Sequence, residues 1–130
     1  MREIKFRGKY SWANEWIYGN LVIDKHGRNH IVPFAYFDED GHHLSYDDDT
    51  DKPVFIKQDS IGQFTGLHDK NGKEIYEGDK FCIGGVIMFV SWHEDSACYI
   101  LRCCYDPINY INLDCDVVYQ KEIIGNIHES

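Results

Sequence analysis

Isoleucine and valine dominate the apolar residues of this chain. Its 130 residues include 15 Ile and 7 Val, against only 5 Leu, 3 Ala and 2 Met. β-Branched side chains suit a pleated strand, whereas Ala, Leu and Met are strong helix formers. Aromatic residues, which make up 15% of the chain, also favour strands. We therefore predict an all-β (β-dominated) fold in which any helix is a short turn.

Four tight turns divide the predicted strands. Asp stands three residues before Gly at residues 24–27, 38–41 and 69–72. In a type I turn, the Asp carboxylate accepts the N–H group two residues on, and Gly takes the left-handed position that follows. The glycine pair at residues 84–85 is typical of a two-residue hairpin turn. Repeated turn chemistry of this kind indicates antiparallel hairpins and is not an active-site motif.

The first lobe is predicted as an antiparallel meander over residues 1–37. Apolar and polar residues alternate over residues 4–12, and further strands follow at residues 16–23 and 29–34. Gly19-Asn20 predicts a bulge or bend in the second of these strands.

The rest of the chain is predicted as an acidic loop and a second lobe. Residues 38–53 hold seven of the 22 acidic residues, which is typical of an exposed loop. Residues 54–130 are interpreted as a small SH3-like bent sheet or barrel, by analogy of pattern only. Its last one or two strands are expected over residues 117–127. The two lobes either pack as one composite domain or stand apart.

Basic residues gather at the start of a chain whose formal net charge is −9. That charge repels phosphate, so it disfavours nucleic-acid binding without excluding a local site. Lys5, Arg7 and Lys9 share one face of the first strand, which is simplest to interpret as the solvated face of an edge strand. With Trp12 and Trp16 as stacking rings, these residues are the candidate nucleic-acid contacts. Cross-strand core pairing explains the same aromatic residues through burial alone.

Cysteine and acidic spacing matches no metal or catalytic motif. The five cysteines lack C-x-x-C spacing and, with no secretory signal, are expected to be free buried thiols in a reducing cytosol: Cys82, Cys98, Cys103, Cys104 and Cys115. Asp47, Asp49 and Asp51 begin like a calcium loop, but Lys52 and Gln58 occupy the diagnostic Gly and Glu positions. We predict no catalytic residue, no metal site, no cofactor and no enzymatic activity.

Three segments resemble the YopX family of phage and prophage proteins. The central run IGQFTGLHDKNGKEIYEGD, residues 61–79, resembles the signature of that family. IKFRG at residues 4–8 with WIYG at residues 16–19 is similar to its start, and IIGNIHE at residues 123–129 is similar to its end. The resemblance implies a small, cytosolic, phage-encoded protein of mostly β structure. It implies no catalytic residue, because the family has no assigned activity.

The leading hypothesis is a phage or prophage accessory protein of unknown biochemical activity that works by protein contact in the cytoplasm of a bacterial host. We expect self-association or a host or phage protein as partner, since open strand edges and surplus aromatics favour both. No membrane role is expected, because no apolar run approaches the ~20 residues of a spanning helix. The alternative is a nucleic-acid-binding protein that uses the basic aromatic hairpin. Weaker alternatives are a metal enzyme that uses the acids and histidines of residues 38–51, a thiol enzyme and an acidic decoy of a host DNA-binding groove. The thiol enzyme would use Cys103 and Cys104, or a nucleophile pair of His93 with Cys98 or Cys82.

Overall fold

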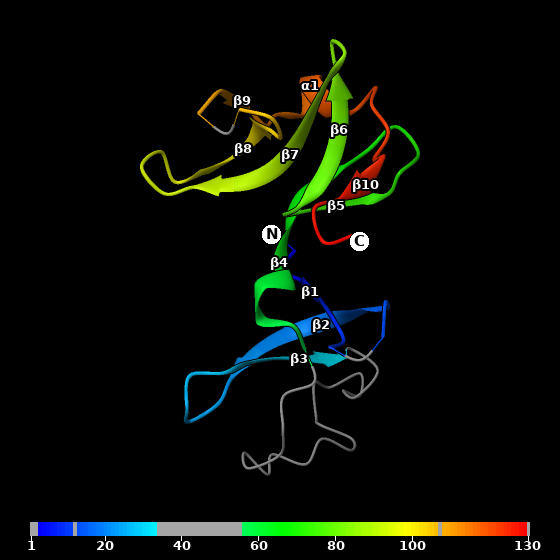
Figure 1. Ribbon diagram of the computed structural model, residues 1–130. Coiled ribbons are helices and arrows are strands. Elements are labelled where there is room, and N and C mark those ends of the chain that lie inside the picture. Colours follow the sequence, from blue (N-terminus) through cyan, green and yellow to red (C-terminus); the bar gives the residue numbers. More distant parts are fainter. Residues whose placement is uncertain (1–2, 12, 34–55, 107, 130) are drawn as a thin grey trace. The chain divides into compact units, whose positions relative to one another are not determined.

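The computed structural model describes residues 3–11, 13–33, 56–106 and 108–129 (Figure 1). Ten strands in these residues form two antiparallel five-stranded sheets, so the β-dominated fold class is confirmed. The only helices among them are two short ones, η2 (Gln58–Ser60) and α1 (Cys115–Val118). The helices in the described part of the chain are too short to cross a membrane.

The chain divides into two compact units, Ile4–Gln63 and Phe64–Ser130, called here the N-terminal and C-terminal units. Strand β4 (Gly62–His68) passes from the first into the second. The predicted acidic loop, residues 38–53, lies outside the described residues, so the predicted division into residues 1–37, 38–53 and 54–130 stays a prediction.

The N-terminal unit holds the predicted meander. β1 (Phe6–Lys9), β2 (Trp16–Ile23) and β3 (Asn29–Pro33) pair antiparallel in sequence order, which confirms this prediction. β1 also pairs on its other side with the start of β4, where Arg7 faces Gly62. The expectation of an edge strand is therefore wrong, because β1 has a hydrogen-bonded neighbour on both sides.

Gly19 supports close pairing in β2 and does not form a bulge. The register continues through it without a shift, from Gly19 opposite Pro33 to Asn20 opposite Val32. A Cβ atom at Gly19 would lie 2.0 Å from the main-chain oxygen of Val32. Glycine is required here because a neighbouring main chain passes too close for any side chain, so the predicted bulge is wrong.

The C-terminal unit is built on a long, curved hairpin (Figure 1). β6 (Asp79–Ile83) and β7 (Val86–His93) meet at Gly84 and Gly85, whose φ angles are 58° and 83°. Positive φ at both central residues is the geometry of a type I′ turn, as the glycine pair predicts. The sheet order is β10-β6-β7-β8-β9, with β8 (Cys98–Cys103), β9 (Tyr110–Asn112) and β10 (Gly125–Asn126).

One face of this sheet packs against α1 and β5 (Glu74–Tyr76). The buried cluster is apolar and consists of Ile75, Phe81, Met88, Val90, Leu101 and Val118. Val118 belongs to α1, which begins where the Asp114 carboxylate accepts the N–H of Val117 at 2.9 Å. Of the one or two strands expected over residues 117–127, the structure therefore forms one, β10, because residues 117 and 118 belong to α1. Of the two predicted forms of this lobe, the described residues show an open, bent sheet and no closed barrel.

Candidate functional site

The basic residues predicted to contact nucleic acid lie mostly inside the N-terminal unit. Arg7 and Lys9 are each only 4% exposed. Their side chains lie over the ring of Trp16, with Arg7 Cζ 4.1 Å and Lys9 Nζ 5.3 Å from the ring centroid. Lys9 Nζ donates to Asn14 Oδ1 at 2.6 Å, and the main-chain N–H of Lys9 donates to Ser60 Oγ at 2.8 Å.

Arg7 and Lys9 lie on one face of β1, as side-chain alternation predicts, and both lie over Trp16, but the cluster serves the packing of this unit. Cations held over an aromatic face gain electrostatic attraction while their stems cover apolar surface. Lys5 and Trp16 are half-buried, and Trp12 lies outside the described residues. The predicted role of these five residues in nucleic-acid binding stays a prediction.

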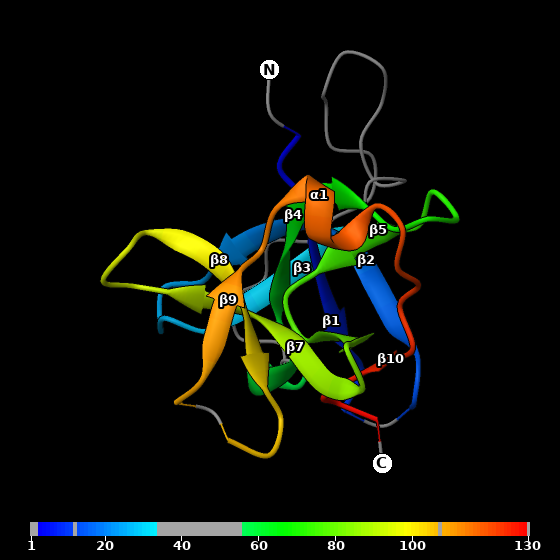
Figure 2. The same cartoon turned by 90° about the horizontal axis from the view of Figure 1, so that it is seen from above.

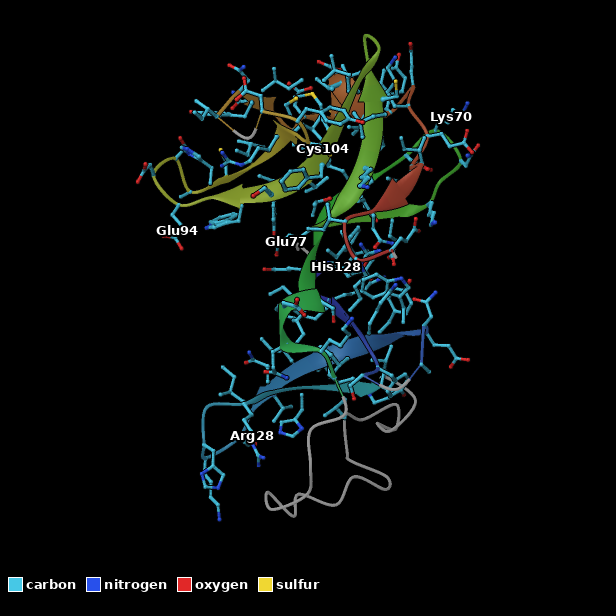
Figure 3. All side chains as sticks on the ribbon, viewed as in Figure 1. Arg28, Lys70, Glu77, Glu94, Cys104 and His128 are labelled. Carbon is cyan, nitrogen blue, oxygen red and sulfur yellow. The ribbon has the colours of Figure 1, made fainter. Side chains whose placement is uncertain are left out.

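The first Asp–Gly turn closes the β2–β3 hairpin, where Figure 3 labels Arg28. Asp24 Oδ1 accepts the main-chain N–H groups of His26 and Arg28 at 2.8 and 2.9 Å. Asp24 Oδ2 accepts from Arg28 Nε at 2.8 Å and lies 2.9 Å from His30 Nε2. Burial acts to raise the pKa of Asp24, but the hydrogen bonds from His30, Arg28 and His26 outweigh it and hold the pKa well below its ordinary value. Gly27 has a φ of 78°, so the predicted turn is confirmed.

The turn at residues 69–72 has the same local geometry but a distant second partner. Asp69 Oδ1 accepts the main-chain N–H groups of Asn71 and Lys73, both at 2.9 Å. Asp69 Oδ2 accepts the N–H of Ile123 at 3.1 Å. Burial acts to raise the pKa of Asp69, yet the N–H groups of Ile123, Lys73 and Asn71 and the charge of Lys73 together lower it. Asp69, at 6% exposed, is thus an ionised anchor for the C-terminal segment.

Other polar residues of the family-like run also support the fold. Thr65 Oγ1 donates to the main-chain oxygen of Ile75 at 2.8 Å. The carboxylate of buried Asp79 accepts the N–H of Tyr76 at 2.8 Å. Lys70, labelled in Figure 3, donates its main-chain N–H to the oxygen of Lys121 at 2.9 Å. The run of residues 61–79 is therefore explained by turns and strand ends, as its glycines and acids predict.

Histidine and cysteine do not gather into a site in the described part of the chain. No three His, Cys, Asp or Glu residues within it are grouped so that they could hold a metal ion. All five cysteines are free thiols, as expected, but the expectation that they are buried is wrong for Cys82 and Cys115, which are exposed. The strand register pairs His93 with Cys98, but His93 Nδ1 lies 3.0 Å from Ser96 Oγ.

Exposed apolar side chains gather instead along β9 and the loop before it. Tyr105 and Ile108 are 85% and 84% exposed, and Tyr110 and Ile111 are 43% and 40% exposed. These four residues are called the hairpin patch below. Figure 2 shows β9 next to β8. The sequence pattern does not predict β9, although the alternation of Tyr110, Ile111, Asn112 and Leu113 is a weak strand signal.

Several exposed large apolar side chains in one short segment are a common sign of a contact surface. Tyr110 and Ile111 are neighbours in β9, so the hairpin patch extends to both faces of the sheet. The hairpin patch also borders an open strand edge, which offers main-chain hydrogen bonds to a partner. These two properties make it the strongest candidate functional site in the described residues.

Comparison with known proteins agrees with the resemblance seen in the sequence. A family model described as YopX protein matches residues 5–130, nearly the whole chain. No curated protein matches this sequence.

Proposed function

Because the chain belongs to the YopX family, we propose that it is a phage- or prophage-encoded accessory protein that binds other proteins and catalyses no reaction. The proposed partner is a second copy of the chain or a protein of the host or phage, met in the bacterial cytoplasm. The hairpin patch is the observation that carries this proposal, since two of its side chains are more than four-fifths exposed.

The polar residues are consistent with a binding role. Three polar side chains that the sequence offers as possible reactive groups each bind main-chain groups of their own unit: Asp69, Asp79 and Thr65. The surface that remains at β9 is aromatic and aliphatic, and such side chains dominate the energetics of protein interfaces.

Nucleic-acid binding is the weaker proposal. Phosphate contacts come from exposed cations, whereas Arg7 and Lys9 are nearly fully buried beside Trp16. A DNA or RNA complex that forms at low salt and weakens steeply as salt rises would favour it over protein contact.

Light scattering at micromolar concentration, followed by affinity capture from lysogenic cells, tests protein contact. The double variant Tyr105→Ser/Ile108→Ser should reduce self-association or the capture of the wild type's partner. Tyr119→Ser/Ile124→Ser is the matched control, because these residues are also exposed apolar residues of the C-terminal unit. A strictly monomeric 15.2 kDa protein that captures nothing would contradict the proposal.

A further inference from the structure

β9 directs main-chain hydrogen-bonding groups away from its own sheet. The N–H of Cys103 donates to the oxygen of Asn109 at 3.1 Å, and the N–H of Leu113 donates to the oxygen of Tyr99 at 3.2 Å. Hydrogen-bonded and non-hydrogen-bonded pairs alternate along an antiparallel ladder. Tyr110 and Asn112, which lie between these bonded positions, therefore turn their N–H and C=O groups toward the open edge of the sheet.

The side chains beside this edge are large, apolar and present on both faces. Tyr110 and Ile111 are neighbours in β9, so they point to opposite faces of the sheet. The Tyr110 ring is positioned by two neighbours, since its centroid lies 4.9 Å from the His93 ring centroid and 5.7 Å from Arg102 Cζ. An added strand would thus meet a pre-positioned aromatic ring on one face and an aliphatic side chain on the other.

The charge around the edge selects the kind of strand that fits. Residues 102–120 contain three acidic residues, Asp106, Asp114 and Asp116, and one basic residue, Arg102, which lies beside the Tyr110 ring. Asp106 precedes β9, and Asp114 follows it by two residues. A second copy of β9 would bring the same three acids with the single Arg102 to this edge, so like charges would outnumber opposite ones and oppose pairing. A strand with basic residues at its ends would place them beside these acids.

We propose that the open edge of β9 binds an extended segment of a partner protein, in which Lys or Arg flanks two or three alternating β-branched residues. The segment adds to the sheet as a strand next to β9, so that Tyr110 and Asn112 exchange main-chain hydrogen bonds with it. This inference rests on the proposed role in protein contact and names the chemistry of the partner. Main-chain bonds supply affinity in strand addition, and side chains beside the edge supply selectivity.

Three labelled peptides titrated by fluorescence anisotropy test the proposal. KTVTVTK carries the proposed chemistry, ETVTVTE reverses its end charges, and KTVPVTK lacks a central N–H donor. Titration to about 1 mM covers the weak affinities expected of a short strand. KTVTVTK should bind most tightly, and its affinity should fall as salt rises.

Variants at one position separate strand addition from other binding. Asn112→Pro removes an outward N–H while the bonds between β8 and β9 remain, and Asn112→Ala keeps that N–H. The proline variant should weaken KTVTVTK binding about tenfold or more, and the alanine variant should bind like the wild type. A urea midpoint for each variant shows whether the unit is still folded.

Two double variants that remove negative charges test whether acidic residues near β9 favour peptides with basic ends. Asp106→Asn with Asp114→Asn should weaken KTVTVTK binding about fivefold at low salt. Asparagine keeps the oxygen that caps α1 at residue 114. Glu15→Gln with Asp59→Asn makes the same change in net charge in the other unit and should leave binding unchanged.

Equal binding of KTVTVTK and ETVTVTE, no binding of either, or equal affinity for the proline and alanine variants would each overturn the inference. The proposed role in protein contact fails by a different result, namely a monomer that captures no other protein. Self-association that Asn112→Pro abolishes, without peptide binding, would keep protein contact and identify a second copy as the occupant of this edge.

Discussion

The two Asp–Gly turns of the described chain share their local chemistry and differ in what they connect. In both, one carboxylate oxygen accepts main-chain N–H groups two and four residues on. The second oxygen of Asp24 binds side chains within six residues, Arg28 and His30. The second oxygen of Asp69 accepts the N–H of Ile123, 54 residues further along the chain.

This difference separates a turn that shapes one hairpin from a turn that anchors another segment. Asp24 stabilises the β2–β3 hairpin through local groups. Its own side chain is only 3% exposed, but the side chains of Arg28 and His30 are 38% and 20% exposed, so water can replace their bonds at modest cost. Asp69 is buried and joins the β4–β5 turn to the segment before β10, so its loss leaves donors of two segments without an acceptor. The same sequence motif is thus local in one unit and long-range in the other.

Replacing the two carboxylates with a methyl group tests this comparison most directly. Asp69→Ala should lower the free energy of unfolding by about 3 kcal/mol, because three main-chain N–H groups lose their acceptor. Asp24→Ala should cost clearly less. Urea unfolding measures both, and hydrogen exchange at the Ile123 amide should rise only in the Asp69 variant. A larger loss for Asp24→Ala would contradict the comparison.

Lowering the pH should reduce the stability that each of the two Asp side chains contributes. The pKa of each carboxyl lies below its ordinary value of 3.8 in the folded protein, so each contributes stability that is complete above about pH 5. This stability is lost as the pH falls through 3.8 toward the folded pKa. The urea midpoints of Asp24→Asn and Asp69→Asn should therefore approach that of the wild type as the pH falls from about 5 to about 2. Parallel curves for wild type and variants would count against ionised anchors.

Substitution of the glycine in either turn should lower the free energy of unfolding by the same amount, because only the local backbone geometry matters at these positions. Gly27 and Gly72 have φ angles of 78° and 80°, and an added Cβ would meet nothing within 4 Å at either. Replacement of either by Ala should cost about 1 kcal/mol from backbone strain alone. Calorimetry of the two single variants checks this, and clearly unequal costs would show that the turns differ locally as well.

High salt should cause the smallest difference in stability between the two turns. Asp24 forms an ion pair with Arg28, whose side chain is 38% exposed, so salt at about 1 M should screen part of its contribution. Asp69 depends chiefly on main-chain N–H groups, which salt screens little. The effect of Arg28→Gln on the urea midpoint should therefore shrink in high salt, while that of Asp69→Asn stays. An unchanged Arg28→Gln effect would indicate that packing, not charge, holds this side chain.

Local rules in the sequence predict the turns well because the turn chemistry lies within four residues. The Asp–Gly turns at residues 24–27 and 69–72 and the glycine pair at residues 84–85 form as their residue types require. The third Asp–Gly turn, at residues 38–41, lies outside the described residues. The strands of the meander follow from the same alternation that identifies their faces.

Long-range pairing is what the sequence pattern does not contain. Alternation correctly places Arg7 and Lys9 on one face of β1, but it cannot show that β4 pairs with β1 from more than 50 residues away. Whether these cations are buried or exposed depends on that pairing, so alternation alone predicts a solvated edge strand. β9 is only three residues long and owes its position to pairing with β8, so its open edge also emerges only in the fold.

The bond between Asp69 and Ile123 also sets an order of events during synthesis. Ribosomes add about 5–20 residues per second, so the N–H of Ile123 is made roughly 3–11 s after the carboxylate that accepts it. Over that interval Asp69 Oδ2 lacks the N–H of Ile123 as its donor, so water must solvate it. The C-terminal unit can therefore reach its final arrangement only after the segment around Ile123 has been made.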